Sequence, residues 1–509
     1  MWLTEIRFPM LRYERQTELA LVDAIHNAIQ FAPEIEVLRA DVGISEAEVT
    51  RQKANFDWNQ FIQANWDENN IPVGSELDGV ANRLEQHTLA TQTGLRRLNQ
   101  VGGQFQLAQD LGLADSNSQF FNPQNQATAN IALQYEQPLL QGAGKFVNMS
   151  VISIALADAN ISQEDFLAGL QTHVLDVVSA YWALVSRRGE YIAQKRSYDR
   201  AVKTATVIAN RVNLDVGPVQ SARAEATLGA RRTALIQAEY AVVFAQEQLL
   251  RLIFGPRFKE SVDTEIIPVS DMSGPLRQVD MDRELQVALQ NRPEIGRSLQ
   301  LIKRSSIEQG VAKNQLLPAL GLTMSLSNQG LRGNRAIGGA INDQFGFGDP
   351  TYGVGISYEF PIGNRAAKAS LRQANMRIKR FQKEFETTVS NVALEVRNAA
   401  HTVALNGKQR EATSRAYQLA KRELTVLENR TALLIDGDKV GPLYLDNLLQ
   451  TQERLATSEL AYVDAASSYA LSQFEMQRAT GTLLRSRPLP VEAASARTWV
   501  HRTHSEPLR

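Results

Sequence analysis

Hydrophobic and polar residues alternate with a period of two in four stretches of the chain. In the last of them, Tyr352, Val354 and Ile356 alternate with Gly353 and Gly355. A period of two predicts strands with one apolar and one polar side. Each stretch is about ten residues long, which is the length of a tilted strand that crosses a bilayer. We expect these strands at about 54–66, 128–137, 318–327 and 351–361.

A period of three and four residues fills most of the remaining chain. From Lys145 to Val212 there is no proline, and a helix of this length spans roughly 100 Å. Two adjacent apolar stripes on one helix predict coiled-coil-like packing against two neighbours, as in a hollow cylinder of helices. The stripes comprise Phe166, Leu170, Val174, Val177, Tyr181 and Leu184, then Val178, Trp182 and Val185, and in the second half Leu371, Ile378, Phe381, Phe385, Val389, Val392, Val396 and Val403.

The two halves of the chain repeat one another. YEQPLLQGAGK at 135–145 matches YEFPIGNRAAK at 358–368, and AIHNAIQFAPEI at 24–35 aligns with ELQVALQNRPEI at 284–295. Each copy then reaches a VGP turn, at 216–218 and 440–442, between two long helices. Pro33 and Pro293 each indicate a helix break followed by a new helix start.

The repeats divide the chain into five parts. The segment between the two repeats is rich in Pro, Gly and Asp and contains one short expected strand near 264–269. We expect an N-terminal segment (1–16), a first repeat (17–254), a connector (255–283), a second repeat (284–484) and a disordered C-terminal tail (485–509).

The first repeat carries 37 more residues than the second between its two expected strands. Within this insertion, Phe105, Leu107 and Leu111 share one parity. The insertion therefore predicts a possible extra hairpin within 87–113, and each chain contributes either four or six strands to its sheet.

Composition excludes several classes of protein. The formal net charge of 509 residues is −1, which gives no electrostatic basis for binding nucleic acid. There is no cysteine, so disulfides, thiol catalysis and zinc–thiolate sites are excluded. The six histidines are scattered, and no catalytic, cofactor or metal motif is present. We therefore expect no enzyme activity, and we expect the Arg187-Arg188 and Arg231-Arg232 pairs to lie on solvated faces.

The order of these motifs resembles the TolC family of outer-membrane channel-tunnels, from about Thr17 to Leu484. The resemblance implies a mixed α+β fold, mainly helical, in which long helices form a periplasmic α-barrel and the strands form a membrane β-barrel. It implies a homotrimer with twelve strands, or eighteen if the extra hairpin joins, placed in the outer membrane. The N-terminus, MWLTEIRFPMLRYERQ, shows no signal peptide. A location in the outer membrane therefore requires a misplaced start codon, a trimmed chain or a fragment.

The resemblance also assigns residues and partners. It places Pro138, Pro318 and Pro361 at the junction of barrel and tunnel. It places the periplasmic tip and gate at Asp446, where the family prototype has an acidic constriction residue. The other residues that it assigns to the tip and gate are Asp215, Gly217, Pro218, Gly441 and Pro442. The prototype has a second acidic residue one turn further on, and this chain has Leu449 at that position. The implied partners are a periplasmic adaptor (membrane fusion protein), an inner-membrane transporter and outer-membrane lipid. The cargo stays open among drugs, metals and proteins.

Two functions are compatible with the sequence. The first, implied by the resemblance, is a passive exit duct of a tripartite efflux or type I secretion system, opened at its tip by its partners. The second is a soluble, elongated coiled-coil scaffold with small capping hairpins, which explains the missing signal peptide but leaves the aromatic-edged strands unexplained.

Overall fold

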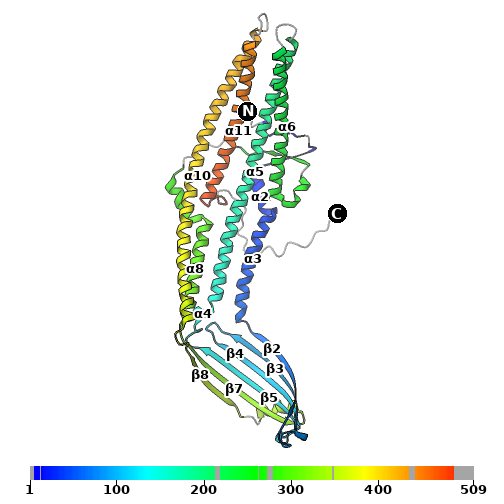
Figure 1. Ribbon diagram of the computed structural model, residues 1–509, viewed down its shortest axis with the longest axis vertical. Coiled ribbons are helices and arrows are strands. Elements are labelled where there is room, and N and C mark those ends of the chain that lie inside the picture. The colour runs from blue at the N-terminus through cyan, green and yellow to red at the C-terminus, as the bar shows by residue number, and fades with distance from the viewer. Residues whose placement is uncertain are drawn as a thin grey trace. The chain divides into compact units, whose positions relative to one another are not determined.

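The computed structural model describes residues 5–11, 13–211, 218–261, 263–271, 279–346, 349–434 and 442–485 (Figure 1). The chain divides into two compact units. The helical unit comprises Met1–Gly43, Ser162–Arg297 and Phe385–Arg509, and the sheet unit comprises Ile44–Ile161 and Ser298–Glu384.

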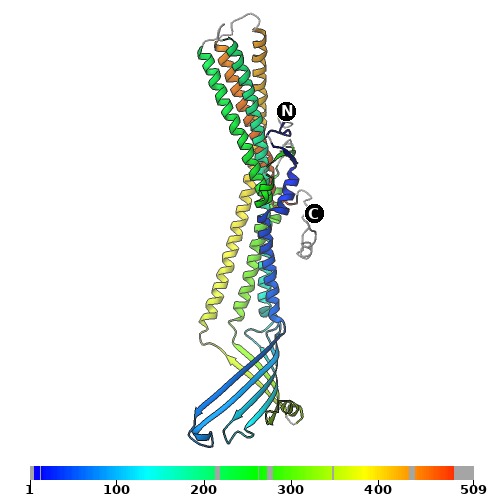
Figure 2. The ribbon, with the colours of Figure 1, turned by 90° about the vertical axis from the view of Figure 1, so that its right-hand side faces the viewer.

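Six antiparallel strands form the sheet of the sheet unit, in the order β2-β3-β4-β5-β7-β8. Figure 2 shows them side by side in one layer. Their bounds are β2 (Asn59–Pro72), β3 (Arg83–Leu98), β4 (Gln104–Ser116), β5 (Asn125–Pro138), β7 (Ala319–Gly333) and β8 (Thr351–Glu359).

The stretch expected as an extra hairpin forms β3 and β4. These two strands are longer than the expected range of 87–113, and they lie inside the sheet, between β2 and β5. Phe105 and Leu107 of β4 stand opposite Tyr135 and Leu133 of β5. The alternation of side chains in this insertion therefore continues the alternation of the neighbouring strands. The sheet of each chain has six strands.

The first strand begins later than its alternation suggested. Ala54–Phe56 form a single 3-10 turn, η1, and β2 starts only at Asn59. Phe56 is buried, whereas Trp58, which has the same parity, is about half exposed. Alternation alone does not mark where a strand begins, because the residues that precede a strand can share its parity without joining its ladder.

A short helix, α9 (Ile337–Gly346), lies between β7 and β8, where the sequence pattern predicted no helix. It packs on β7 and β5 of the same sheet.

Long helices make up most of the rest of the fold. Prolines begin α3, α6, α8 and α11, as expected of a residue that needs no N–H partner in the first helical turn. Figures 1 and 2 show α5 beside α6 and α10 beside α11 in the helical unit. The helices are α2 (Leu21–Phe31), α3 (Pro33–Lys53), α4 (Lys145–Asn148), α5 (Ser150–Arg211), α6 (Pro218–Phe254), α7 (Met281–Asn291), α8 (Pro293–Asn314), α10 (Arg365–Leu434) and α11 (Pro442–Ala479).

The predicted stripes form the core of the helical unit. Five residues of the first stripe, from Leu170 to Leu184, and all three of the second are buried in one cluster with α2, α6 and α11. In the second half, Val392, Val396 and Val403 are buried in another cluster with α7, α8 and α11. The prediction that one helix packs against several neighbours is confirmed.

Two short strands join segments that are far apart in the sequence. The strand expected near 264–269 is β6 (Thr264–Pro268), and it pairs in parallel with β1 (Arg15–Leu19). Thr17 stands opposite Ile266. The N-terminal segment is therefore attached to the connector between the repeats.

A buried ion pair holds this attachment. Arg188 of α5 and Glu265 of β6 have fully buried side chains and lie 2.7 Å apart, from Nη1 to Oε1. Arg188 also donates to the carbonyl oxygens of Ile6 and Phe8, and Glu265 accepts from the N–H of Met10. Burial lowers the pKa of Arg188 below its usual value, and Glu265 opposes that shift.

The expectation of solvated arginine pairs is thus wrong for Arg188 and for Arg231. Arg188 is fully buried, and the side chain of Arg231 is 16% exposed and forms an ion pair with Glu453. A guanidinium can lie in the core between helices when carbonyl groups and a carboxylate accept hydrogen bonds from its N–H groups. The sequence did not reveal these acceptors, because they belong to segments far away along the chain.

Replacing Arg188 with Met should detach the N-terminal segment. The change leaves the Glu265 carboxylate buried without its partner, which costs about 3–5 kcal/mol. Hydrogen exchange of residues 5–11 and 264–268 should accelerate. Arg187→Met is the control, because the ion pair of Arg187 with Glu190 is exposed and such pairs contribute about 0–1 kcal/mol. Equal exchange in the two variants contradicts the prediction.

Candidate functional site

The sheet has one apolar and one polar face across its strands. Residues that pair in antiparallel strands point to the same side of the sheet. One row of paired residues on the apolar face is Leu95, Leu107, Leu133, Leu326 and Tyr352, and one row on the polar face is Gln63, Gln92, Asp110, Asn130 and Gln329.

Much of the apolar face is open. Ile62 and Trp66 of β2 are 69% and 63% exposed, and Val354 and Ile356 of β8 are 70% and 72% exposed. A sheet face with this composition is normally covered by a helix layer or a second sheet when it lies in water. The described residues do not cover these four side chains in this way.

α9 covers one end of the apolar face. Ala340 is fully buried against Ala127 and Ala129 of β5. A Cβ at Gly330 of β7 would meet the Ala340 carbonyl and the backbone of Gln344, so only glycine admits this approach. Leu111 and Leu113 of β4 and Ile337 of α9 are partly buried around this contact, so α9 covers an apolar part of the sheet.

Polar contacts fix α9 on the sheet. Gln344 is fully buried and its Oε1 accepts from Gln109 Nε2 at 3.0 Å. Asp343 pairs with Arg332 of β7. On its outer side, α9 presents Ile341 and Phe345, 37% and 69% exposed. The helix thus covers apolar side chains of the sheet and presents two apolar side chains of its own on its outer surface.

The sheet has two free edges. Within the described chain, β2 pairs only with β3 and β8 pairs only with β7. β2 has 14 residues and β8 has nine. Long edge strands with unpaired backbone groups readily pair with another chain.

The three predicted junction prolines all lie where strand gives way to helix. Pro138 is the last residue of β5, Pro318 directly precedes β7, and Pro361 lies between β8 and α10. A missing N–H suits a strand terminus, because no ladder bond is lost there.

Two asparagines at these junctions were missed by the sequence reasoning. Asn314, at the end of α8, accepts from the N–H of Gly142 at 2.8 Å through Oδ1 and donates to the Leu140 carbonyl. Asn364 is buried, has a positive φ of 42°, and donates to the Leu316 carbonyl. Asparagine tolerates this conformation better than most residues, but no local signal shows that its side chain reaches the turn between α8 and β7.

The predicted tip residues are placed only in part. Asp215, Gly217 and Gly441 lie outside the described residues. Pro218 and Pro442 are the first residues of α6 and α11.

Asp446, the predicted gate residue, forms an ion pair with Arg223 of α6. Its side chain is 39% exposed and that of Arg223 is 59% exposed. One turn further along α11, Leu449 packs against Ile208 and Ala224. The pair therefore connects helices from the two halves of the chain, and Arg223 had no signal in the sequence because its partner lies 223 residues away.

The described residues contain no group of acidic and histidine side chains placed to hold a metal ion. None of the described helices includes a stretch apolar enough to cross a bilayer.

Comparison with solved structures identifies the fold. No model of a known protein family matches the sequence, and no curated protein matches it. The chain is similar to the CmeC outer membrane channel of Campylobacter jejuni, with 14% identity, a TM-score of 0.65, and 94% of this chain and 91% of that one covered. It is similar to the outer membrane protein VceC from Vibrio cholerae, with 15% identity, a TM-score of 0.64, and 91% and 96% covered. For the open state of the MtrE outer membrane channel of Neisseria gonorrhoeae, the identity is 16%, the TM-score 0.64, and the coverage 94% and 96%.

These matches extend over nearly the whole of each chain, so both units and their connections are shared. The chain therefore has the fold of outer-membrane channels, which is the fold implied by its resemblance to the TolC family.

Proposed function

We propose that the chain is an outer-membrane channel, the passive exit duct of a tripartite efflux or type I secretion system. The observation that carries this proposal is the uncovered apolar face of the sheet, with a polar face behind it. In a bilayer the apolar face contacts lipid and the polar face borders a water-filled duct. The similar proteins with this fold are named as outer membrane channels, which supports the same conclusion.

Closing the duct takes more than one copy. A sheet that crosses a membrane leaves no free edge, because unpaired backbone groups in hydrocarbon cost several kcal/mol each. β8 of one copy can pair with β2 of the next, since these are the two free edges. With the trimer that the TolC-like fold implies, three sheets of six strands form a barrel of eighteen.

The extra hairpin widens the barrel. The diameter of a β-barrel grows roughly linearly with its number of strands. Eighteen strands give a barrel about half as wide again as twelve. The apolar and polar faces continue through β3 and β4, so the hairpin lengthens the wall of the barrel and keeps one face apolar and the other polar.

The helices supply the tunnel and its gate. We place the partners at the tips of α6 and α11: a periplasmic adaptor that docks there and an inner-membrane transporter that supplies energy. The Asp446–Arg223 pair connects these helices. Opening is then a shift between closed and open helix packing that the partners favour.

The alternative of a soluble coiled-coil scaffold explains the helices equally well. It gives no reason for a six-stranded sheet with four strongly exposed apolar side chains on its edge strands. The open face of the sheet therefore favours the channel.

Labels on adjacent residues of β8 should report opposite environments. The sequence has no cysteine, so a nitroxide can be attached to Ile356→Cys on the apolar face or to Ser357→Cys on the polar face. In reconstituted vesicles, the label at 356 should be relaxed by oxygen and shielded from a water-soluble nickel chelate. The label at 357 should show the reverse. Access of the nickel chelate to both positions would exclude the lipid-facing assignment.

The strand count can be read directly by electron microscopy of the detergent-purified oligomer. The full chain should show eighteen strands. A variant without residues 83–116, which joins β2 to β5, should form a barrel narrower by about one third. Twelve strands in the full-length barrel would mean that the hairpin is not part of the wall.

Asp446→Ala should raise the open probability of single channels in planar bilayers. An exposed ion pair contributes up to about 1 kcal/mol, so the open population should increase by at most about fivefold. Arg223→Ala should have the same effect, and the double variant should add nothing further because both changes remove one interaction. Arg232→Ala, an exposed charge on the same helix, serves as the control. If the Asp446 variant conducts like the unmodified protein, the gate lies elsewhere.

A further inference from the structure

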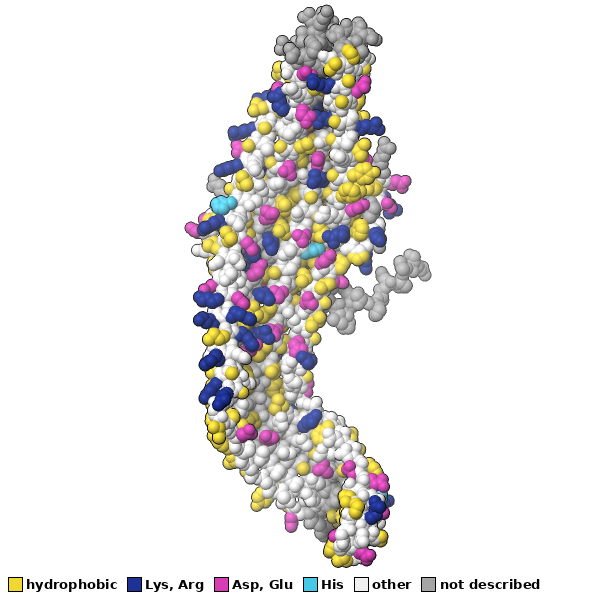
Figure 3. All heavy atoms as spheres, in the orientation of Figure 1, with side chains coloured by type: hydrophobic (Ala, Val, Ile, Leu, Met, Phe, Trp, Pro, Cys, Tyr) yellow, Lys and Arg dark blue, Asp and Glu magenta, His cyan; other side chains and the backbone are white. Residues whose placement is uncertain are grey.

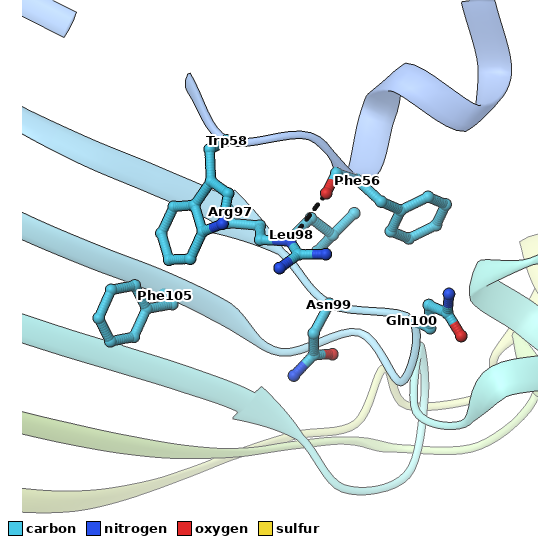
Figure 4. A pocket seen from close by; sticks show the side chains of 7 residues that line it. All are labelled: Phe56, Trp58, Arg97, Leu98, Asn99, Gln100 and Phe105. Atoms are coloured by element: carbon cyan, nitrogen blue, oxygen red, sulfur yellow. Dashed lines mark hydrogen bonds between the residues drawn. The ribbon is translucent and has the colours of Figure 1, made fainter. Parts of the chain in front are cut away.

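A pocket of about 380 Å³ lies at the end of the apolar face where β2 begins (Figure 4). Trp58 directly precedes β2, Arg97 and Leu98 end β3, and Phe105 is near the start of β4. The seven lining residues are Phe56, Trp58, Arg97, Leu98, Asn99, Gln100 and Phe105.

The pocket combines aromatic walls with one guanidinium. The rings of Trp58 and Phe105 meet edge to face with centroids 5.5 Å apart. The guanidinium carbon of Arg97 lies 5.4 Å from the centroid of Trp58, a cation–π distance. Figure 4 shows Arg97 between the Trp58 ring and the backbone of Phe56, to whose carbonyl oxygen its Nε donates at 2.9 Å.

The positive charge of Arg97 has no acidic partner. Across the described residues, no carboxylate lies within ion-pairing distance of its guanidinium. Nε is used by Phe56, whereas Nη1 and Nη2 make no hydrogen bond to any described group. The side chain is therefore held by one hydrogen bond and by the Trp58 ring, and its Nη1 and Nη2 groups are free to donate to a ligand.

The floor of the pocket is fixed by Asn99. Its Oδ1 accepts from the N–H groups of Val101 and Gly103 at 3.0 and 2.7 Å, and its Nδ2 donates to the Tyr135 hydroxyl at 3.1 Å. These bonds hold the β3–β4 turn against β5. The pocket is thus a preformed feature of the sheet.

Further positive charge lies at the same end of the sheet, at the edge opposite to β2. β8 ends there, and the first twenty residues of α10 contain seven basic side chains and one acidic one, Glu384. Arg377 and Arg380 are paired with Glu308 and Glu384. Figure 3 shows Lys and Arg side chains gathered over α8 and α10 in the sheet unit. The basic residues are Arg365, Lys368, Arg372, Arg377, Lys379, Arg380 and Lys383.

We propose that this pocket binds the phosphate-bearing headgroup of a membrane phospholipid. The proposal rests on the function proposed above, in which the apolar face contacts lipid. Nη1 and Nη2 of Arg97 donate to the phosphate oxygens, and a guanidinium suits phosphate because its donors are fixed in a planar fork. Trp58 and Phe105 border the headgroup, as aromatic residues do at membrane interfaces.

The neighbouring surface fits the rest of the lipid. Leu95 and Leu107 form the next pair of residues on the apolar face beyond Arg97 and Phe105. Acyl chains that leave the pocket along the strands meet this apolar row. A free phosphate ion has a single guanidinium to bind and makes no use of the apolar row, so the lipid is the better fit.

The test compares two adjacent arginines on opposite faces of β3. The guanidinium of Arg96 lies over Phe61 on the polar face, so Arg96→Gln removes the same charge without touching the pocket. Native mass spectrometry of the full-length protein, titrated with dioleoylphosphatidylglycerol, measures lipid binding. Arg97→Gln should weaken it by about tenfold, the effect of losing one charge-assisted contact. Arg97→Lys should lie in between, because it keeps the charge and loses the fork.

Each alternative has its own outcome. Equal lipid binding by the Arg96→Gln and Arg97→Gln variants, with the label at 356 in lipid, would exclude the proposed lipid site at Arg97. The proposed channel function would remain supported. Displacement of the lipid by inorganic phosphate at equal concentration overturns it in favour of a free-anion site. If the label at 356 lies in water, the proposed function itself fails.

Discussion

The structure depends on one constraint, the alternation of apolar and polar residues that neighbouring strands of the sheet keep in register. Rows such as Leu95, Leu107, Leu133, Leu326 and Tyr352 bring together apolar side chains from five strands of both halves of the chain. A shift of one residue in any strand would turn its apolar set to the other face. The register is therefore set by the need to keep one face apolar, and that face requires an apolar environment which the described chain supplies only at one end, through α9.

The two units meet different physical demands. In the helical unit, most of the apolar stripe residues are buried by neighbouring helices of the same chain. Leu405, Leu419 and Val426 of α10 stay exposed. In the sheet unit, both the apolar face and the two edges are left for something outside the chain. In the proposed channel, lipid covers the face and a second copy pairs with the edges, which is why a channel accounts for the sheet better than a scaffold does.

Polar contacts determine how the elements are held together. The buried Arg188–Glu265 pair holds the N-terminal segment, the exposed Asp446–Arg223 pair joins helices near the tips, and Asn99 fixes the turn beneath the Arg97 pocket. Their consequences differ with burial. A buried pair is costly to break, since one charge is then left buried without a partner, whereas an exposed pair contributes little and is compatible with the opening proposed above.

Local periods and the geometry of proline predicted four strands of the sheet, the long helices, the positions of the junction prolines and the parity of the extra hairpin. Contacts between distant segments place β3 and β4 inside the sheet, α9 over Gly330, Arg188 in a buried ion pair and Asp446 beside Arg223. These facts depend on pairs of residues far apart in the chain, and the physical reason is general. A period shows which side of an element is apolar, whereas the partner that covers that side is chosen by packing in three dimensions.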